Sequence, residues 1–152
     1  MTAFKDLTPY DYLGKRETSE IPVLNIGWLG TDEFNKGETS PEFKAILFQF
    51  CLDSNLVLIM RGFHACPFYG LSWIEWGRSH PEYGPDAGLM SIGDGEIRVI
   101  GKSVIYAAPA LIYHYVFEHG YLPPKEFVDA VLTGAQPGSE EHRKLLVAYR
   151  KE

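Results

Sequence analysis

Proline, glycine and serine divide the C-terminal part of the chain into short segments of different hydrophobic period. Residues 96–100 and 103–106 are mostly apolar and β-branched, and Gly101-Lys102 separates them, which predicts two strands joined by a two-residue turn. A turn at Gly93-Asp94 allows one more short strand, beginning at residue 89, to precede them. The pattern therefore predicts a three-stranded meander.

Three helices are expected after the meander, because residues that start and end helices alternate along the chain. Pro109, Pro124 and Ser139 stand where helices open, and Gly120 and Gly134 stand just past the ends of the first two. A run of strands followed by a run of helices is typical of an α+β fold.

The N-terminal half adds an early helix and two strands. Ser40-Pro41-Glu42 supplies an N-cap, a first-turn proline and a first-turn carboxylate, which predicts a helix start. Residues 21–29 predict a strand, in which Pro22, having no N–H to donate, suits an edge strand or the first residue of a strand. The apolar run 56–60 predicts a central strand buried on both faces. Residues 1–20 are expected to be irregular and to lay aromatic side chains on the domain. The predicted fold is α+β: a small mixed or antiparallel sheet of about four to five strands, packed with the early helix and three C-terminal helices.

Composition and charge narrow the class of protein. The 152 residues are 45% hydrophobic and 22% charged, which predicts one globular domain spanning 1–152. No apolar run reaches the roughly 20 residues of a membrane span, and the N-terminus lacks the apolar stretch of a signal peptide, so a cytoplasmic location is expected. The net charge of −6 disfavours nucleic acid and anionic membranes as partners. Cys51 and Cys66 are expected to be reduced thiols, and the alternative is a single disulfide bond between them.

The segment 62–88 is rich in glycine, proline and aromatic residues, and it is too long for an ordinary connection. Long irregular segments held by a rigid framework commonly form recognition surfaces, while the alternative is an Ω-loop that packs on itself. Aromatic and acidic side chains of this segment are the candidate partner-binding residues: Tyr69, Trp73, Glu75, Trp76, Glu82, Tyr83 and Asp86.

His64 and Cys66 are the weak candidates for a metal site or a nucleophile. Zinc requires three or four ligands, and no Cys-x-x-Cys pair lies nearby, since Tyr69 occupies the position of a second cysteine. A histidine could activate Cys66, but a buried free thiol explains this residue as well. No metal and no cofactor is therefore predicted.

Two other groups of polar residues have ordinary structural explanations. His114 and Glu118 share a helix face, whereas His119, five residues from His114, should point away and interact with the C-terminal carbonyls of its helix. Asp94 and Glu96 are expected to be solvated turn residues. The common enzyme signatures, such as phosphate-binding glycine loops, Gly-x-Ser-x-Gly and His-Glu-x-x-His, do not occur in the sequence.

Several stretches together resemble a family of small bacterial proteins of unknown function. They are Asn25-Ile-Gly-Trp-Leu29, Arg61-Gly-Phe-His64-Ala-Cys66, and the run from Ile105-Tyr-Ala-Ala-Pro109 to Pro124-Lys-Glu-Phe127, and the resemblance extends to about Leu132. The resemblance implies that relatives carry His-x-Cys-x-x-Cys where this chain has Tyr69, and that departure weakens a metal or redox role here. It implies no activity and no catalytic residue.

The leading hypothesis is a protein-binding function. Small acidic proteins of this kind include immunity proteins, which neutralise a cognate toxin by occluding its active site, and a toxin with a basic surface would suit the acidic and aromatic segment. One alternative is a small hydrolase or thiol enzyme that uses Cys66 with His64 or with His114. The other is a metal-stabilised structural module.

Overall fold

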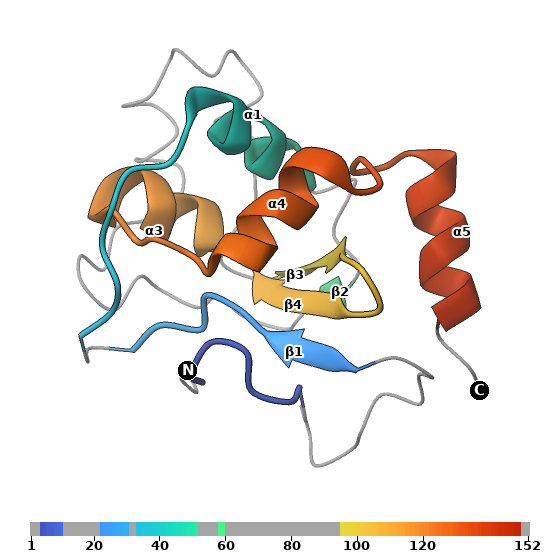
Figure 1. Cartoon of the computed structure of the whole chain (residues 1–152), viewed down its shortest axis with the longest axis horizontal. Helices are drawn as coiled ribbons and strands as arrows, with labels where there is room; N and C mark the ends of the chain where they lie inside the picture. The colour runs from blue at the N-terminus through green and yellow to red at the C-terminus, as the bar shows by residue number, and fades with distance from the viewer. Residues whose placement is uncertain (1–3, 11–21, 31–32, 52–57, 60–94, 150–152) are drawn as a thin grey trace.

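The computed structural model describes residues 4–10, 22–30, 33–51, 58–59 and 95–149. Within these residues the sheet has the strand order β1-β4-β3-β2 (Figure 1). Strand β1 (Val23–Asn25) is parallel to β4 (Ile105–Pro109), and β3 (Gly95–Ile100) is antiparallel both to β4 and to β2 (Leu58–Ile59). The sheet is therefore mixed, and the β3–β4 hairpin forms its centre.

The structure confirms the α+β class but changes the roles of the strands. Only β1, β3 and β4 of the described strands have three residues or more, so the sheet reaches the predicted four to five strands only if the two-residue β2 is counted. The run 56–60, predicted as a central strand, contributes the two-residue β2 at the end of the strand order, because the β3–β4 hairpin occupies the centre. The first strand of the predicted meander, at residues 89–92, lies outside the described residues.

The β3–β4 connection is longer than the predicted two-residue turn. The strands pair as far as Ile100 and Ile105, which leaves four residues between them, and the Gly101 N–H donates to the Val104 carbonyl at 2.8 Å. Ser103 adopts a positive φ of 56° in this turn, a conformation that a sequence pattern centred on Gly101 does not reveal.

Pro109 ends β4 and does not open a helix. It pairs with Glu96 across the hairpin, and the next residue, Ala110, donates its N–H to the Gly95 carbonyl at 2.9 Å. Pairing thus continues past the proline, so α3 (Ile112–His119) begins later than predicted.

The remaining helices start and end close to their predicted signals. Helix α1 (Pro41–Phe50) is capped by Ser40, whose hydroxyl accepts the Phe43 N–H at 3.1 Å. Helix α4 (Lys125–Thr133) follows Pro124, and α5 (Glu140–Tyr149) follows Ser139, which accepts the His142 N–H at 3.1 Å. Side-chain caps of this kind satisfy N–H groups that have no partner within the helix.

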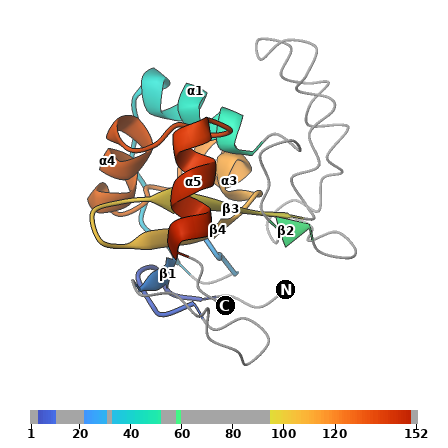
Figure 2. The same cartoon turned by 90° about the vertical axis from the view of Figure 1, so that its right-hand side faces the viewer.

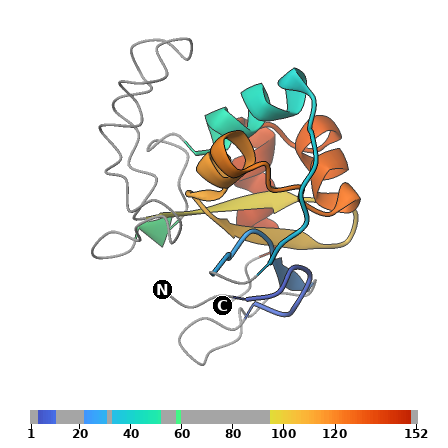
Figure 3. The ribbon, with the colours of Figure 1, turned by 90° about the vertical axis from the view of Figure 1, so that its left-hand side faces the viewer.

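Two hydrophobic clusters lie on opposite faces of the sheet. Helices α1, α3 and α4 cover one face, where Ile97, Val99 and Tyr106 join the larger cluster (Figures 1 and 3). Residues 4–10 lie on the other side, beyond β1, where Tyr10 and Trp28 belong to the smaller cluster (Figure 2). Both faces of β3 and β4 are therefore covered, and every residue of these two strands is buried.

No helix in the described parts of the chain has both the length and the apolar character needed to cross a bilayer.

Candidate functional site

The N-terminal segment is attached to β1 and to the residues after it by backbone hydrogen bonds. The Tyr10 N–H donates to Val23 at 2.8 Å, and the Phe4 N–H donates to Trp28 at 3.0 Å. The rings of Phe4 and Trp28 meet edge to face at 5.8 Å. The prediction that this irregular segment lays aromatic side chains on the domain is confirmed for its described residues.

Asp6 connects this segment to the end of α3. One carboxylate oxygen accepts the Gly27 N–H at 2.9 Å, and the other accepts the Tyr121 hydroxyl proton at 2.7 Å. Gly27 has a φ of +75°, and a Cβ at this position would lie 2.8 Å from Ile112 Cδ1. Only glycine fits here without strain, so the N-terminal segment, the residues after β1 and helix α3 are held in close contact.

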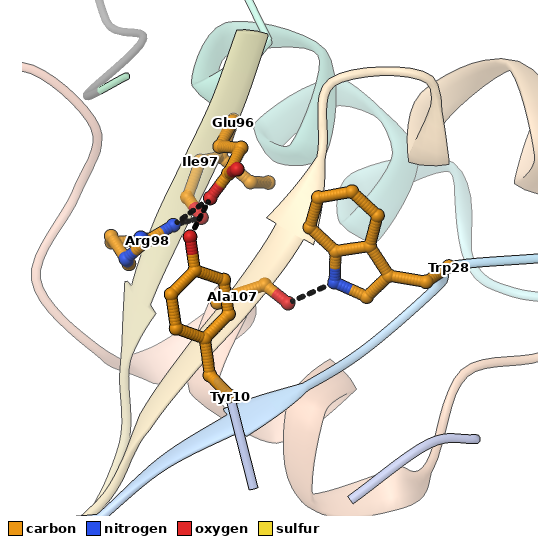
Figure 4. A network of polar contacts seen from close by, with 6 residues as sticks. All are labelled: Tyr10, Trp28, Glu96, Ile97, Arg98 and Ala107. Atoms are coloured by element: carbon orange, nitrogen blue, oxygen red, sulfur yellow. Dashed lines mark hydrogen bonds and ion pairs between the residues drawn. The ribbon is translucent and has the colours of Figure 1, made fainter. Parts of the chain in front are cut away.

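A buried polar network lies beneath the same segment (Figure 4). The Tyr10 hydroxyl donates to Glu96 Oε1 at 3.0 Å, and Arg98 Nη1 donates to the same oxygen at 2.8 Å. The Arg98 guanidinium also lies 4.7 Å from the centre of the Tyr10 ring. Glu96 is fully buried and Arg98 is 4% exposed, so the two charges are compensated inside the protein and not by solvent.

The neighbours of this network are also engaged in hydrogen bonds. Trp28 Nε1 donates to the Ala107 carbonyl at 3.0 Å, and a ring nitrogen of His142 lies 2.8 Å from the Arg98 carbonyl. Burial raises the pKa of the Tyr10 hydroxyl well above its ordinary value, while the Arg98 charge lowers it and the Glu96 charge raises it by smaller amounts. Tyr10 therefore acts as a hydrogen-bond donor and not as a base.

Glu96 has one carboxylate oxygen that the described residues do not satisfy. Oε2 is buried, and no donor in the described part of the chain reaches it. Glu96 is paired with Leu58 across β3 and β2. Near the start of β3, the Glu96 carboxylate can thus accept one more hydrogen bond.

The β2–β3 pair brings the ends of a long segment together. Ile59 and Gly95 are paired across the two strands, so the two residues that flank 60–94 lie side by side. The Glu96 ion pair is adjacent to this junction in sequence. The framework therefore holds both ends of the segment in which the aromatic and acidic candidates occur.

A second polar pair lies at the C-terminal end of α3. The Nε2 atoms of His114 and His119 are 3.3 Å apart, and their ring centres are 4.9 Å apart with the planes at 82°. The prediction that His119 points away from His114 is therefore wrong. The reason is a widened last turn, in which the N–H groups of Gly120 and Tyr121 both donate to the Tyr115 carbonyl instead of following regular α-helical spacing.

Most of the predicted site residues are not placed by the structure. The partner-binding candidates and the weak metal candidates lie outside the described residues: Tyr69, Trp73, Glu75, Trp76, Glu82, Tyr83, Asp86, His64 and Cys66. Cys51 is a buried free thiol, and burial raises its pKa well above the ordinary value. Within the described residues, no group of three or more histidine, cysteine, aspartate or glutamate side chains is arranged to hold a metal.

Glu96 was expected in solvent and is instead fully buried, which is a further correction. In a strand, the spacing Glu96-Ile-Arg98 places both charges on one face. This alternation was the feature of the sequence from which the ion pair could have been predicted. Nothing in the local sequence could have identified Tyr10, which is 86 positions away from Glu96, as the third member.

Comparison with known proteins identifies one family. A family model described as "Domain of unknown function (DUF7919)" matches residues 2–132, which agrees with the extent of the resemblance noted in the sequence. No curated protein and no solved structure matches the chain.

Proposed function

The chain belongs to this family of domains of unknown function, and we propose that it is a protein-binding protein, specifically an immunity protein that neutralises a cognate toxin. Residues 67–88 form the binding element in this proposal. The enzyme alternative, which depends on Cys66, is tested separately below.

The junction between β2 and β3 is the observation that supports this proposal. The Ile59–Gly95 pair holds the two residues that flank 60–94 next to each other in the sheet. Binding residues are commonly carried by a long connection whose ends a rigid scaffold holds, because the scaffold limits the entropy that binding must remove. The framework beneath the junction is buried on both faces and contains the Tyr10–Glu96–Arg98 network.

The chemistry of the segment defines the partner. Tyrosine and tryptophan provide large, rigid contact surfaces, and the segment contains Tyr69, Trp73, Trp76 and Tyr83. Carboxylates of the same segment, with the net charge of −6, complement a basic cleft and accelerate association with it. A toxin with a basic active site is the proposed partner.

The experiment is an affinity purification of the tagged protein from the cells that produce it, at low and moderate salt. The proposal expects one basic protein in equimolar amount, which is toxic when expressed alone and harmless when co-expressed with this chain. Association should slow as ionic strength rises, because screening weakens charge attraction. Absence of any such partner under both salt conditions overturns the proposal.

The role of the segment is tested in the purified complex. The double variant Glu75→Ala with Trp76→Ala should weaken binding by about tenfold or more, as expected for an aromatic anchor with a neighbouring charge. Glu140→Ala is the matched control, because its carboxylate is 83% exposed on α5, and it should bind as the wild type does. A folded double variant with unchanged affinity would remove this part of the segment from the interface.

A further inference from the structure

We propose that His114 and His119 are two ligands of a site for a divalent transition metal of the zinc type. The site is at the C-terminal end of α3 and is independent of the proposed partner-binding function. Three properties of the pair support it: the distance between the two nitrogens, the way the helix end holds them, and the ligand chemistry of imidazole.

The first property is the distance. Zinc binds histidine nitrogen at about 2.0–2.1 Å in a tetrahedral arrangement, so two nitrogens on one ion are about 3.3–3.4 Å apart. The Nε2 atoms of His114 and His119 are 3.3 Å apart. A hydrogen bond between the two rings has a similar length, so the experiment below separates the two arrangements.

The second property is the fixed geometry of the helix end. Tyr115 accepts both the Gly120 and the Tyr121 N–H, the latter at 3.1 Å, and Gly120 adopts a left-handed conformation with φ of 68°. Tyr121 is 1% exposed, and its hydroxyl donates to Asp6 at 2.7 Å. The widened turn is therefore held from outside the helix, and residues five positions apart present their Nε2 atoms to each other.

The third property is the chemistry of the pair. Neutral imidazole suits zinc, copper and nickel, and a ligand nitrogen must be unprotonated to bind. His114 is 3% exposed, which shields this side of the site from water, whereas His119 is half-buried. No third histidine, cysteine, aspartate or glutamate joins the pair within the described residues, so water takes the remaining coordination positions in this proposal.

The test uses the full chain after removal of metals with a chelator. Zinc is titrated calorimetrically, and cobalt is titrated as a spectroscopic substitute whose visible absorption reports nitrogen coordination. The wild type should bind one equivalent on the micromolar scale or tighter. His114→Gln and His119→Gln should each lose about tenfold or more in affinity, since even changes in groups that only orient metal ligands cost about 10- to 100-fold.

His142→Gln is the matched control, because His142 is equally buried and its ring nitrogen contacts the Arg98 carbonyl. It should bind zinc as the wild type does. If the buried His114 variant does not fold, the His119 variant and the imidazole NMR signals of the zinc-titrated wild type decide the question. Absence of saturable binding at millimolar zinc, or equal binding by a folded His119 variant, overturns the proposal and leaves the pair as a hydrogen bond.

Discussion

Removal of the Arg98 charge is the perturbation for which the structure makes the sharpest prediction. In Arg98→Met, Glu96 keeps the Tyr10 hydroxyl as a donor but loses the only described cation within salt-bridge distance, while it remains fully buried. Breaking a buried ion pair from one side costs about 3–5 kcal/mol, because an uncompensated charge is left in a poorly polarisable interior. We expect a loss of stability in this range at neutral pH.

Urea unfolding followed by tryptophan fluorescence measures this loss. With an m-value of about 2 kcal/mol/M, a cost of about 3–5 kcal/mol lowers the unfolding midpoint by about 1.5–2.5 M. Glu140→Gln is the control, because it breaks the exposed Glu140–Lys144 pair on α5, for which about 0.5 kcal/mol or less is expected.

The double variant Glu96→Leu with Arg98→Met separates the charge from the packing. It removes both charges and should lie within about 2 kcal/mol of the wild type, well above the single Arg98 variant, because no buried charge is left without a partner. The reasoning is refuted if Arg98→Met costs no more than the exposed control, or if the double variant is as unstable as the two single variants added together.

Three further outcomes are expected. Burial raises the pKa of Tyr10 and Tyr121 above the ordinary value of about 10. The stability that these two hydroxyls contribute is therefore complete below about pH 10 and decreases as the pH rises beyond it. During alkaline unfolding, the ultraviolet absorbance of tyrosinate should increase in one cooperative step. Gly27→Ala should destabilise the fold by about 1–3 kcal/mol in urea unfolding, because its φ is +75° and the added Cβ meets an α3 side chain at 2.8 Å; wild-type stability would contradict this. When the native protein is alkylated and its peptides are analysed by mass spectrometry, the buried Cys51 should be protected, so it serves as the internal reference for Cys66. If Cys66 in a metal-free sample reacts no faster than free cysteine, the result argues against the thiol-enzyme alternative.

The parts of the fold that could be predicted depend on contacts within about one helical turn. Ser40 and Ser139 cap the helices they precede, and Gly120 ends α3 in the left-handed conformation, because each acts on backbone groups a few residues away. The place of β2 at the edge of the sheet was not predictable, since an apolar run indicates burial but not which strands lie beside it. The continuation of β4 through Pro109 likewise depends on pairing with β3.

The candidate site was less accessible from the sequence than the fold. Glu96 was assigned to solvent because it follows a turn signal, yet the sheet and the N-terminal segment enclose it. Regular helical spacing predicted that His114 and His119 point in different directions. The structure brings them together through a turn that the Tyr121–Asp6 hydrogen bond holds from outside the helix.

The sequence by itself determined the class of fold, the main helix boundaries and the membership of an uncharacterised family, because caps, turn residues and hydrophobic periods act locally. Only the tertiary structure decided which polar side chains meet. Tyr10 reaches Glu96 across 86 positions, and Tyr121 reaches Asp6 across 115, so their contacts depend on how the sheet, α3 and the N-terminal segment pack. Side chains far apart in sequence are brought within 3 Å by the burial of apolar surface, which is not directional and leaves no local pattern in the sequence.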